Sequence, residues 1–306
     1  MKITASDYIK QIDAALKAGN ATEQTHRPSL KAFLEGLGDN ITATNEPQRI
    51  ECGSPDYVVT RGTVPLGYVE AKDVGADLDK ISESEQLRRY RGSLRNLLLT
   101  DYLDFRLFRN GELVQSGRLA RLQKNGGLRR EPGGEAQVET LLRWFFTSDV
   151  PSIASPRELA ERMARLARLL HDLIRGVFAH EGRRGDLHAQ YDAFCKVLIG
   201  DLSVDQFADM YSQTIAYGLF AARCNHVGRG FTREHAGHEL PKTNPFLRKL
   251  FNTIAGADLD DRIAWAVDDL AELLARADME TILEDFGRAT RQEDPVVHFY
   301  ETFLAA

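Results

Sequence analysis

The chain has 306 residues, 43% hydrophobic and 27% charged, so it is long enough for two ordinary domains and too apolar for global disorder. Its net charge of −6 argues against a protein whose whole surface binds nucleic acid. The charge is uneven. The first 150 residues carry 21 basic and 21 acidic side chains, which leaves 18 of the 39 basic and 24 of the 45 acidic residues for the remainder.

The sequence lacks the signals of several classes of protein. No run of about 18 apolar residues is present, and the N-terminus has no apolar signal-peptide core, so no membrane partner is expected. Cys52, Cys195 and Cys224 are too scattered for a disulfide framework, which favours a cytoplasmic location. Neither a phosphate-binding loop nor a methyltransferase signature occurs, so we expect no ATP-driven translocation and no DNA methylation by this chain.

The chain begins with two predicted helices and a strand. Apolar residues at helical spacing predict a helix over residues 5–18, with Ser6 as its N-cap. A second helix is predicted over 22–37, where Pro28 marks either a late start or a kink. Residues 41–50 are typical of a strand.

A β-hairpin is predicted next, within residues 52–72. Tyr57 to Thr60 and the pair Tyr68-Val69 are aromatic or β-branched, as strands favour. Between them, residues 61–65 contain the glycine and proline of a turn. The sequence around this hairpin carries most of the chain's recognisable chemistry.

Three charged side chains of the hairpin are expected on one face. A loop with an odd number of residues makes the numbers of opposed residues sum to about 126 or 128, which places Asp56 opposite Glu70 or opposite Lys72. Glu70 and Lys72 share a face because strand side chains alternate. A two-residue loop, with a sum of about 127, would put Asp56 on the other face. The prediction can therefore fail.

Two carboxylates beside an ammonium group have two interpretations. Mg²⁺ in proteins takes one or two carboxylates, waters and substrate phosphate, and a nearby lysine orients water or stabilises developing charge. Asp56, Glu70 and Lys72 fit that chemistry. The alternative is a cross-strand salt bridge on a solvated hairpin, which contributes little to stability.

The following helix places Gln86 and Tyr90 on one face, because they are four residues apart. Arginines follow the hairpin at positions where DNA phosphates are one possible partner and solvent is the other: Arg88, Arg89, Arg91 and Arg95. The alternative for the whole segment is an ordinary amphipathic helix with Leu87, Tyr90 and Leu94 on its core face.

The rest of the first 150 residues completes an α/β domain. Two strands are predicted at 96–101 and 105–109, the second followed by the turn pair Asn110-Gly111. A surface loop or linker is expected at 123–135 and a helix at 138–146. Residues 148–156 are expected to form a domain boundary.

From Ser155 onward the pattern predicts helices only, and Ser155-Pro156 supplies an N-cap and a first-turn proline. Further helices are predicted at 187–200, 203–224, 243–255, 259–276, 278–289 and 296–306. Residues 228–234 are expected to form a loop. Four cysteine and histidine residues that flank it could bind Zn²⁺, but their spacing matches no known zinc pattern: Cys224, His226, His235 and His238.

The pieces together resemble a known family. Pro55-Asp56 followed by Glu70-Ala71-Lys72 is similar to the PD-(D/E)xK nuclease motif. The run from Glu23 to Leu30 resembles the first helix of nuclease domains in fused restriction-modification enzymes of the type ISP and type IIG kind, and the Gln86-x-x-x-Tyr90 spacing follows in the expected order. The stretch 211–220 resembles the segment that precedes the methyltransferase domain of those enzymes.

The resemblance implies a restriction-endonuclease-like α/β domain over 1–150 and an all-α connector over 151–306 that leads to methyltransferase and target-recognition domains outside this sequence. It implies Mg²⁺-dependent hydrolysis of double-stranded DNA. Asp56 and Glu70 would hold the metal, with Glu23 as a further ligand, and Lys72 would position the attacking water. Gln86 and Tyr90 would approach the scissile strand.

Other functions remain open at this stage. Glu23 has an ordinary explanation as an acidic residue at a helix start. The fold is also compatible with an inactive DNA-binding or coupling module, or with a stand-alone DNA repair nuclease.

Overall fold

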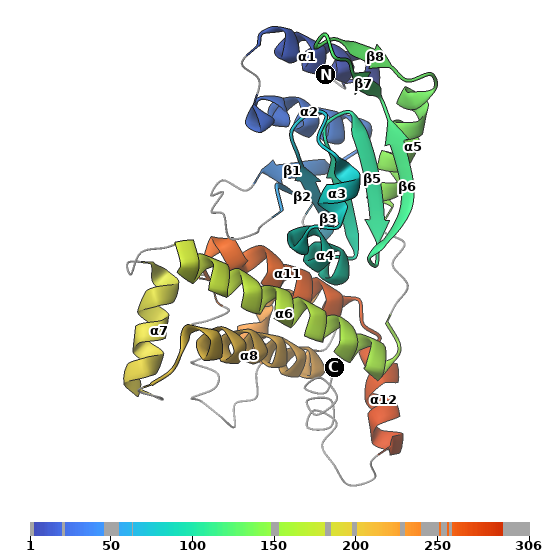
Figure 1. The fold of residues 1–306 in the computed structure, drawn as a ribbon. Coiled ribbons are helices and arrows are strands. Elements are labelled where there is room, and N and C mark those ends of the chain that lie inside the picture. The colour runs from blue at the N-terminus through green and yellow to red at the C-terminus, as the bar shows by residue number, and fades with distance from the viewer. Residues whose placement is uncertain are drawn as a thin grey trace. The chain divides into compact units, whose positions relative to one another are not determined.

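The structure is a computed structural model that describes residues 3–19, 22–45, 55–62, 64–147, 153–180, 185–197, 201–226, 230–239, 251, 256 and 259–289 (Figure 1). The chain divides into two compact units. One comprises residues 1–49 and 55–149, and the other comprises 50–54 and 150–306. The predictions for 46–50, Cys52, most of 243–255 and 296–306 lie outside the described residues.

The first unit is built on a six-stranded mixed sheet whose strands lie in chain order. The pair β3–β4 is parallel and the other described pairs are antiparallel. A parallel pair needs a long crossover, which here contains the helices α3 (Leu78–Ser82) and α4 (Glu85–Ser93). The strands are β1 (Ile41–Asn45), β2 (Tyr57–Arg61), β3 (Val64–Ala71), β4 (Asn96–Thr100), β5 (Asp104–Arg109) and β6 (Glu112–Arg118).

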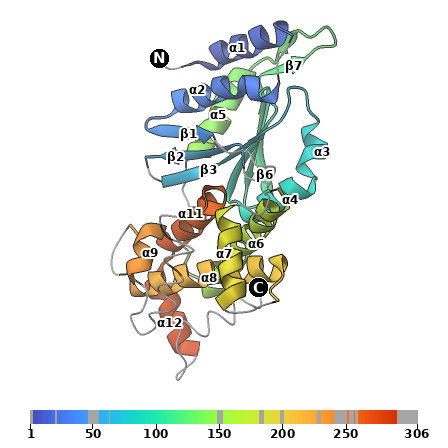
Figure 2. The same ribbon diagram turned by 90° about the vertical axis from the view of Figure 1, so that its left-hand side faces the viewer.

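Helices cover both faces of this sheet (Figure 2). The main apolar core lies between the sheet and the helices α1 (Ala5–Lys17), α2 (Arg27–Leu37) and α5 (Gly134–Phe146). Gly67 permits a close approach of α5, because a Cβ there would lie 2.7 Å from a ring carbon of Phe145. The opposite face lies toward α3 and α4, whose predicted apolar residues Leu87 and Tyr90 are buried. The predicted α/β architecture is therefore confirmed.

Two details at the N-terminus differ from the prediction. Thr4, and not Ser6, caps α1, because the Thr4 hydroxyl accepts a hydrogen bond from the Asp7 N–H at 3.2 Å. The predicted helix at 22–37 is divided into a short 3₁₀ helix, η1 (Glu23–His26), and α2. Pro28 lies in the first turn of α2, so it marks the late start.

The hairpin of β2 and β3 reaches the expected register by an unexpected route. Arg61 pairs with Val64, so residues 62–63 connect the strands and the predicted odd-numbered loop is wrong. A bulge then leaves Leu66 without a paired residue, and from Val59 to Tyr57 the opposed numbers sum to 126. The bulge reverses the parity that the short turn sets. It brings Asp56, which directly precedes β2, to the face that carries Glu70.

The second half of the unit contains a confirmed turn and an unpredicted hairpin. Asn110 and Gly111 both have positive φ and connect β5 with β6, as the Asn-Gly pair predicts. Within the segment expected to be a loop, however, β8 (Leu128–Arg130) pairs with β7 (Ala120–Leu122) in a separate antiparallel ribbon. The helix α5 also begins earlier than predicted, at Gly134.

The described part of the second unit is helical apart from a bridge between Ile153 and Ala277. The Ser155 carbonyl accepts the first helical hydrogen bond from Leu159 at 3.0 Å, which confirms the predicted start of α6. Residues 230–232 form no helix or strand, as the predicted loop requires, and a helix that was not predicted begins at Arg233. The helices are α6 (Pro156–His180), α7 (Asp186–Val197), α8 (Val204–Asn225), α9 (Arg233–Glu239), α11 (Asp261–Ala275) and α12 (Met279–Ala289). Among the described helices, none has the length and apolar character needed to cross a membrane.

Candidate nuclease site

The structure brings Asp56, Glu70 and Lys72 together at the adjacent ends of β2 and β3. The Lys72 ammonium lies 2.6 Å from the Glu70 carboxylate. Between these residues in the chain, the Ala71 N–H donates a hydrogen bond to Asp56 Oδ2 at 2.8 Å. The exposed fractions are only 4% for Asp56 and 2% for Glu70, while Lys72 is half-buried. Two buried carboxylates and one ammonium group therefore share one surface of the hairpin.

Arg27 is a member of this cluster that the sequence did not reveal. Its guanidinium, carried on the first turn of α2, donates to Asp56 Oδ1, and both side chains are buried. A second guanidinium nitrogen donates to the Asn45 side chain at 3.2 Å. The Arg27 carbonyl accepts a hydrogen bond from the Tyr57 hydroxyl at 2.9 Å. Arg27 is thus fixed at both its backbone and its side chain.

Gln86 and Tyr90 approach the same carboxylates from α4. The Gln86 amide donates to the Tyr90 hydroxyl at 3.3 Å, as expected for residues on one helix face. Burial raises the pKa of Tyr90 well above its ordinary value, and the negative charges of Glu70 and Asp56 raise it further. The Tyr90 hydroxyl therefore remains protonated and is a hydrogen-bond donor beside the carboxylate pair.

Glu23, Arg88 and Arg91 do not form part of the described cluster. Glu23 is the first residue of η1, and its side chain lies outside the described part of the chain. Arg88 and Arg91 both pair with Glu83, at 2.9 and 3.2 Å, and Arg91 also lies over the Phe108 ring. Two of the arginines considered as phosphate contacts are therefore engaged within the protein. Exposed pairs of this kind are weak, so they do not prevent other contacts.

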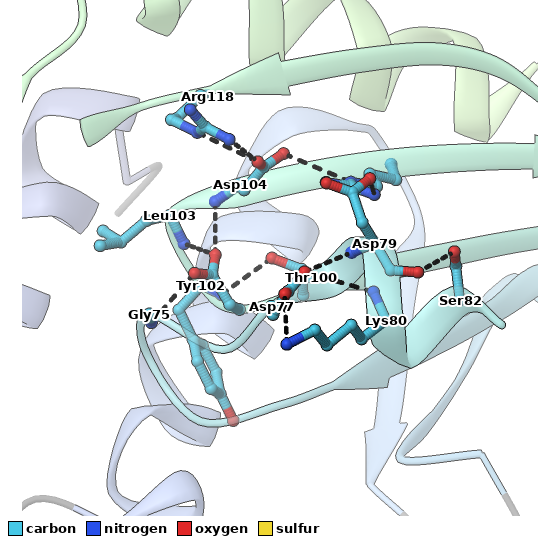
Figure 3. Close-up of polar contacts among 12 residues, drawn as sticks. Gly75, Asp77, Asp79, Lys80, Ser82, Thr100, Tyr102, Leu103, Asp104 and Arg118 are labelled. Atoms are coloured by element: carbon cyan, nitrogen blue, oxygen red, sulfur yellow. Dashed lines mark hydrogen bonds and ion pairs between the residues drawn. The ribbon is translucent and has the colours of Figure 1, made fainter. Parts of the chain in front are cut away.

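The next strand end supports the segment that follows Lys72. The Lys72 N–H donates to the Thr100 carbonyl at 2.8 Å. The Gly75 N–H donates to Asp101 Oδ2 at 3.0 Å, and Figure 3 shows Gly75 beside the strand ends that carry Thr100 and Asp104. The other oxygen of Asp101 accepts the N–H groups of Leu103 and Asp104. Burial raises the pKa of Asp101, against the lowering effect of these three backbone bonds.

His26 is a further buried group that the sequence did not single out. It immediately precedes Arg27, and its ring centroid lies 5.2 Å from that of Tyr102. Burial lowers the pKa of His26, and the negative charge of Asp73 opposes that shift. Tyr102 itself has a positive φ of 70°, which is uncommon for a bulky residue and typical of constrained sites. His26 therefore packs against the turn between β4 and β5.

The residues present fit a hard divalent cation. Asp56 Oδ1 accepts a hydrogen bond from the Arg27 guanidinium, and Asp56 Oδ2 accepts one from the Ala71 N–H, so the carboxylate is held beside Glu70. Asp56 and Glu70 together supply the one or two carboxylates that Mg²⁺ takes in proteins. Among the described residues, no group of three His, Cys, Asp or Glu side chains is arranged to hold a metal ion. Waters and substrate phosphate would have to complete the coordination.

Two of the histidines considered as zinc ligands make contacts within the second unit. His226 Nδ1 lies 3.4 Å from a Glu239 carboxylate oxygen, and His235 Nδ1 lies 2.8 Å from the Thr232 hydroxyl. The α9 helix carries His235 and His238. These contacts are local and assemble no ligand set among the residues that the structure describes.

Comparison with known proteins adds little to this geometry. No protein-family model matches the chain, and no curated protein matches it. Among solved structures, the chain has a likeness to a cryo-electron-microscopy structure of a DrdV–DNA complex, with 21% sequence identity and a TM-score of 0.37. The likeness covers 48% of this chain and 97% of that chain. A likeness this weak carries no argument, so the geometry of the site must support any function.

Proposed function

We propose that this chain is the endonuclease portion of a restriction-modification enzyme and hydrolyses phosphodiester bonds of double-stranded DNA with Mg²⁺. The observation that supports this most is the meeting of Asp56, Glu70 and Lys72 on one surface, with Asp56 bound to the backbone N–H of Ala71 between the other two. The bulge at Leu66 makes that meeting possible, because the two-residue turn alone gives the opposite parity.

Each side chain has a defined task in this proposal. Asp56 and Glu70 would hold the cation, which supplies a water of lowered pKa and offsets charge on the phosphoryl group. Lys72 orients the attacking water or stabilises the charge that develops on the phosphate oxygens. Arg27 holds one Asp56 oxygen in place. Gln86 orients the protonated Tyr90 hydroxyl, which donates toward the scissile strand.

The wider assignment is also a proposal. The first unit would be the nuclease, and the helical unit would connect it to methyltransferase and target-recognition domains of a longer chain. Glu23 remains a candidate third ligand. A cytoplasmic location fits this assignment, since restriction and modification act on intracellular DNA.

One observation favours a second candidate, a DNA-binding or coupling module without catalysis. Arg27 already pairs with Asp56, and Lys72 already pairs with Glu70, so the two negative charges are matched by two positive charges within the protein. A network of this kind can be structural. The two candidates differ in whether a divalent cation joins the carboxylates.

A nicking assay separates the two candidates. The full chain is incubated with supercoiled plasmid and Mg²⁺, with a parallel reaction in a chelator. We expect nicking that requires Mg²⁺, and we expect Glu70→Gln to remove it while Lys10→Ala, an exposed change on α1, leaves it unchanged. Mg²⁺-independent nicking, or full activity of Glu70→Gln, would refute the metal site. Absence of nicking with retained DNA binding would support the coupling module.

A further inference from the structure

The ribbon formed by β7 and β8 has one apolar face and one basic face. Its register places Leu122 opposite Leu128 and Arg121 opposite Arg129, and strand alternation puts the two pairs on opposite faces. Leu128 packs against the main core of the unit. The arginine pair therefore faces away from the core. Residues 120–130 contain four basic side chains and no acidic one.

The apolar face attaches the ribbon to the candidate site. A Cβ on Gly75 would lie 3.1 Å from Cδ2 of Leu122, so these residues are in contact. Gly75 follows Lys72 by three positions and is held by the Asp101 carboxylate. Val74 packs at the edge of the same core as Leu128. The ribbon therefore lies against the segment that leaves the candidate catalytic lysine.

The outer face has an excess of positive charge. Arg121 and Arg129 are directly opposed, and like charges in that position are mutually destabilising. Glu131 offsets part of this charge through an ion pair with Arg121 at 2.9 Å, and Arg121, Arg118 and Arg129 together lower the pKa of Glu131. Within the described part of the chain, neither Lys124 nor Arg129 forms an ion pair. Both side chains are exposed.

The tip of the ribbon is ordered by its own hydrogen bonds. The Gln123 N–H donates to the Gly127 carbonyl at 2.9 Å, and the Gly127 N–H donates to the Asn125 side chain at 3.0 Å. Gly126 adopts φ of +80°, which suits a tight turn. The exposed Lys124 lies within this turn, two residues after Leu122.

We propose that the outer face of the β7–β8 ribbon, formed by Arg121, Lys124 and Arg129, binds backbone phosphates of double-stranded DNA beside the candidate cleavage site. This inference rests on the proposed function for its choice of DNA as the anionic partner. Arginine and lysine contacts to phosphates position DNA without reading its sequence. The two directly opposed arginines suit such a partner, because a phosphate relieves their mutual repulsion.

Equilibrium binding to a DNA duplex tests the proposal. Affinity of the full chain is measured in a chelator, over a range of salt concentrations, so that cleavage plays no part. The test variant is the double substitution Lys124→Ala/Arg129→Ala. The control, Lys10→Ala/Lys17→Ala, removes the same charge from α1 of the same unit. Thermal melting establishes that each variant is folded, and Arg129→Lys tests whether charge alone suffices.

We expect the test variant to bind about tenfold more weakly than the control and to show a salt slope smaller by about two, since each phosphate contact contributes roughly 0.9. Arg129→Lys should retain most of the affinity. Equal affinity and slope in the test and control variants would overturn the proposal, as would a wild-type chain that does not bind duplex DNA. Mg²⁺-dependent nicking of plasmid at low salt is scored separately, so failure of the ribbon proposal leaves the metal site supported.

Discussion

Two buried aspartates at neighbouring strand ends show what distinguishes a candidate catalytic carboxylate from a structural one. Asp101, after β4, accepts three backbone N–H groups and thereby fixes the tight β4–β5 turn and the segment containing Gly75. Asp56, before β2, accepts one backbone N–H and one guanidinium. Charged side chains therefore take part in holding Asp56, whereas backbone groups hold Asp101. Burial and a position at a strand end are therefore not enough to identify a metal ligand.

The largest expected effect comes from removing the Arg27 guanidinium, which pairs with Asp56. Arg27→Met leaves the buried Asp56 carboxylate without its cationic partner, which should cost about 3–5 kcal/mol of unfolding free energy. We expect added Mg²⁺ to restore part of this loss, because the cation replaces the missing charge. Denaturant unfolding with and without Mg²⁺ measures both effects. If Mg²⁺ stabilises wild type and variant equally, the cation does not reach Asp56.

Lys72 gives the next effect, which we expect mainly on activity. Lys72→Ala should reduce nicking by about 10²-fold or more, as expected for loss of a positioned charge in a transition state. The substitution also removes the ion pair with the buried Glu70 carboxylate, so it should lower the unfolding free energy as well. Nicking rates and melting temperatures are compared with those of Lys10→Ala. Cleavage by Lys72→Ala at the wild-type rate would remove the lysine from the mechanism.

Substitution of Asp101 should lower stability without changing cation binding. Asp101→Ala removes the acceptor for three backbone N–H groups and should lower the unfolding free energy by about 1–3 kcal/mol. Asp101→Asn, which keeps one oxygen, should cost less. Divalent-cation affinity, measured well below the melting temperature, should be unchanged. A loss of cation binding would place Asp101 in the metal site and erase the distinction from Asp56.

The smallest expected effect is a pH dependence at His26. Burial lowers the folded-state pKa of His26, so the unfolded chain binds a proton first as the pH falls below about 6.5. Stability contributed by the neutral ring is thus fully present above that pH and is lost toward the lower folded-state pKa. His26→Phe should flatten this part of the curve of melting temperature against pH between 8 and 5. An unchanged curve would show that His26 does not contribute to it.

The sequence predicted the cluster through strand alternation, which needs only local information. Asp56, Glu70 and Lys72 lie close to one turn, so the parity of their positions limited the possible arrangements. The predicted odd-numbered turn was wrong, because the strand and turn signals gave no indication of the bulge at Leu66, which restores the parity of the pairing. The two-residue turn and the bulge were both missed, and because each shifts the pairing by one residue, the predicted register at Asp56 was still right.

Contacts between residues that are far apart in the sequence could not be predicted from strand alternation. Arg27 lies 29 positions before Asp56, and its sequence context indicates only a helix start. The glycines and charges of the β7–β8 ribbon led to the prediction of a loop. The alternation of leucine and arginine on both sides of its tip could have indicated two short strands. The function of Glu23 is still a prediction, since its side chain lies outside the described residues.

Direct measurement of cation binding tests the central claim most simply. The full chain is titrated calorimetrically with Mn²⁺, in place of Mg²⁺, together with a duplex whose phosphodiester bonds resist cleavage. We predict a binding event that Asp56→Asn/Glu70→Gln abolishes and that the control Asp7→Asn/Asp13→Asn, on α1, retains. Equal binding by the wild type and by the chain lacking both carboxylates would contradict the account.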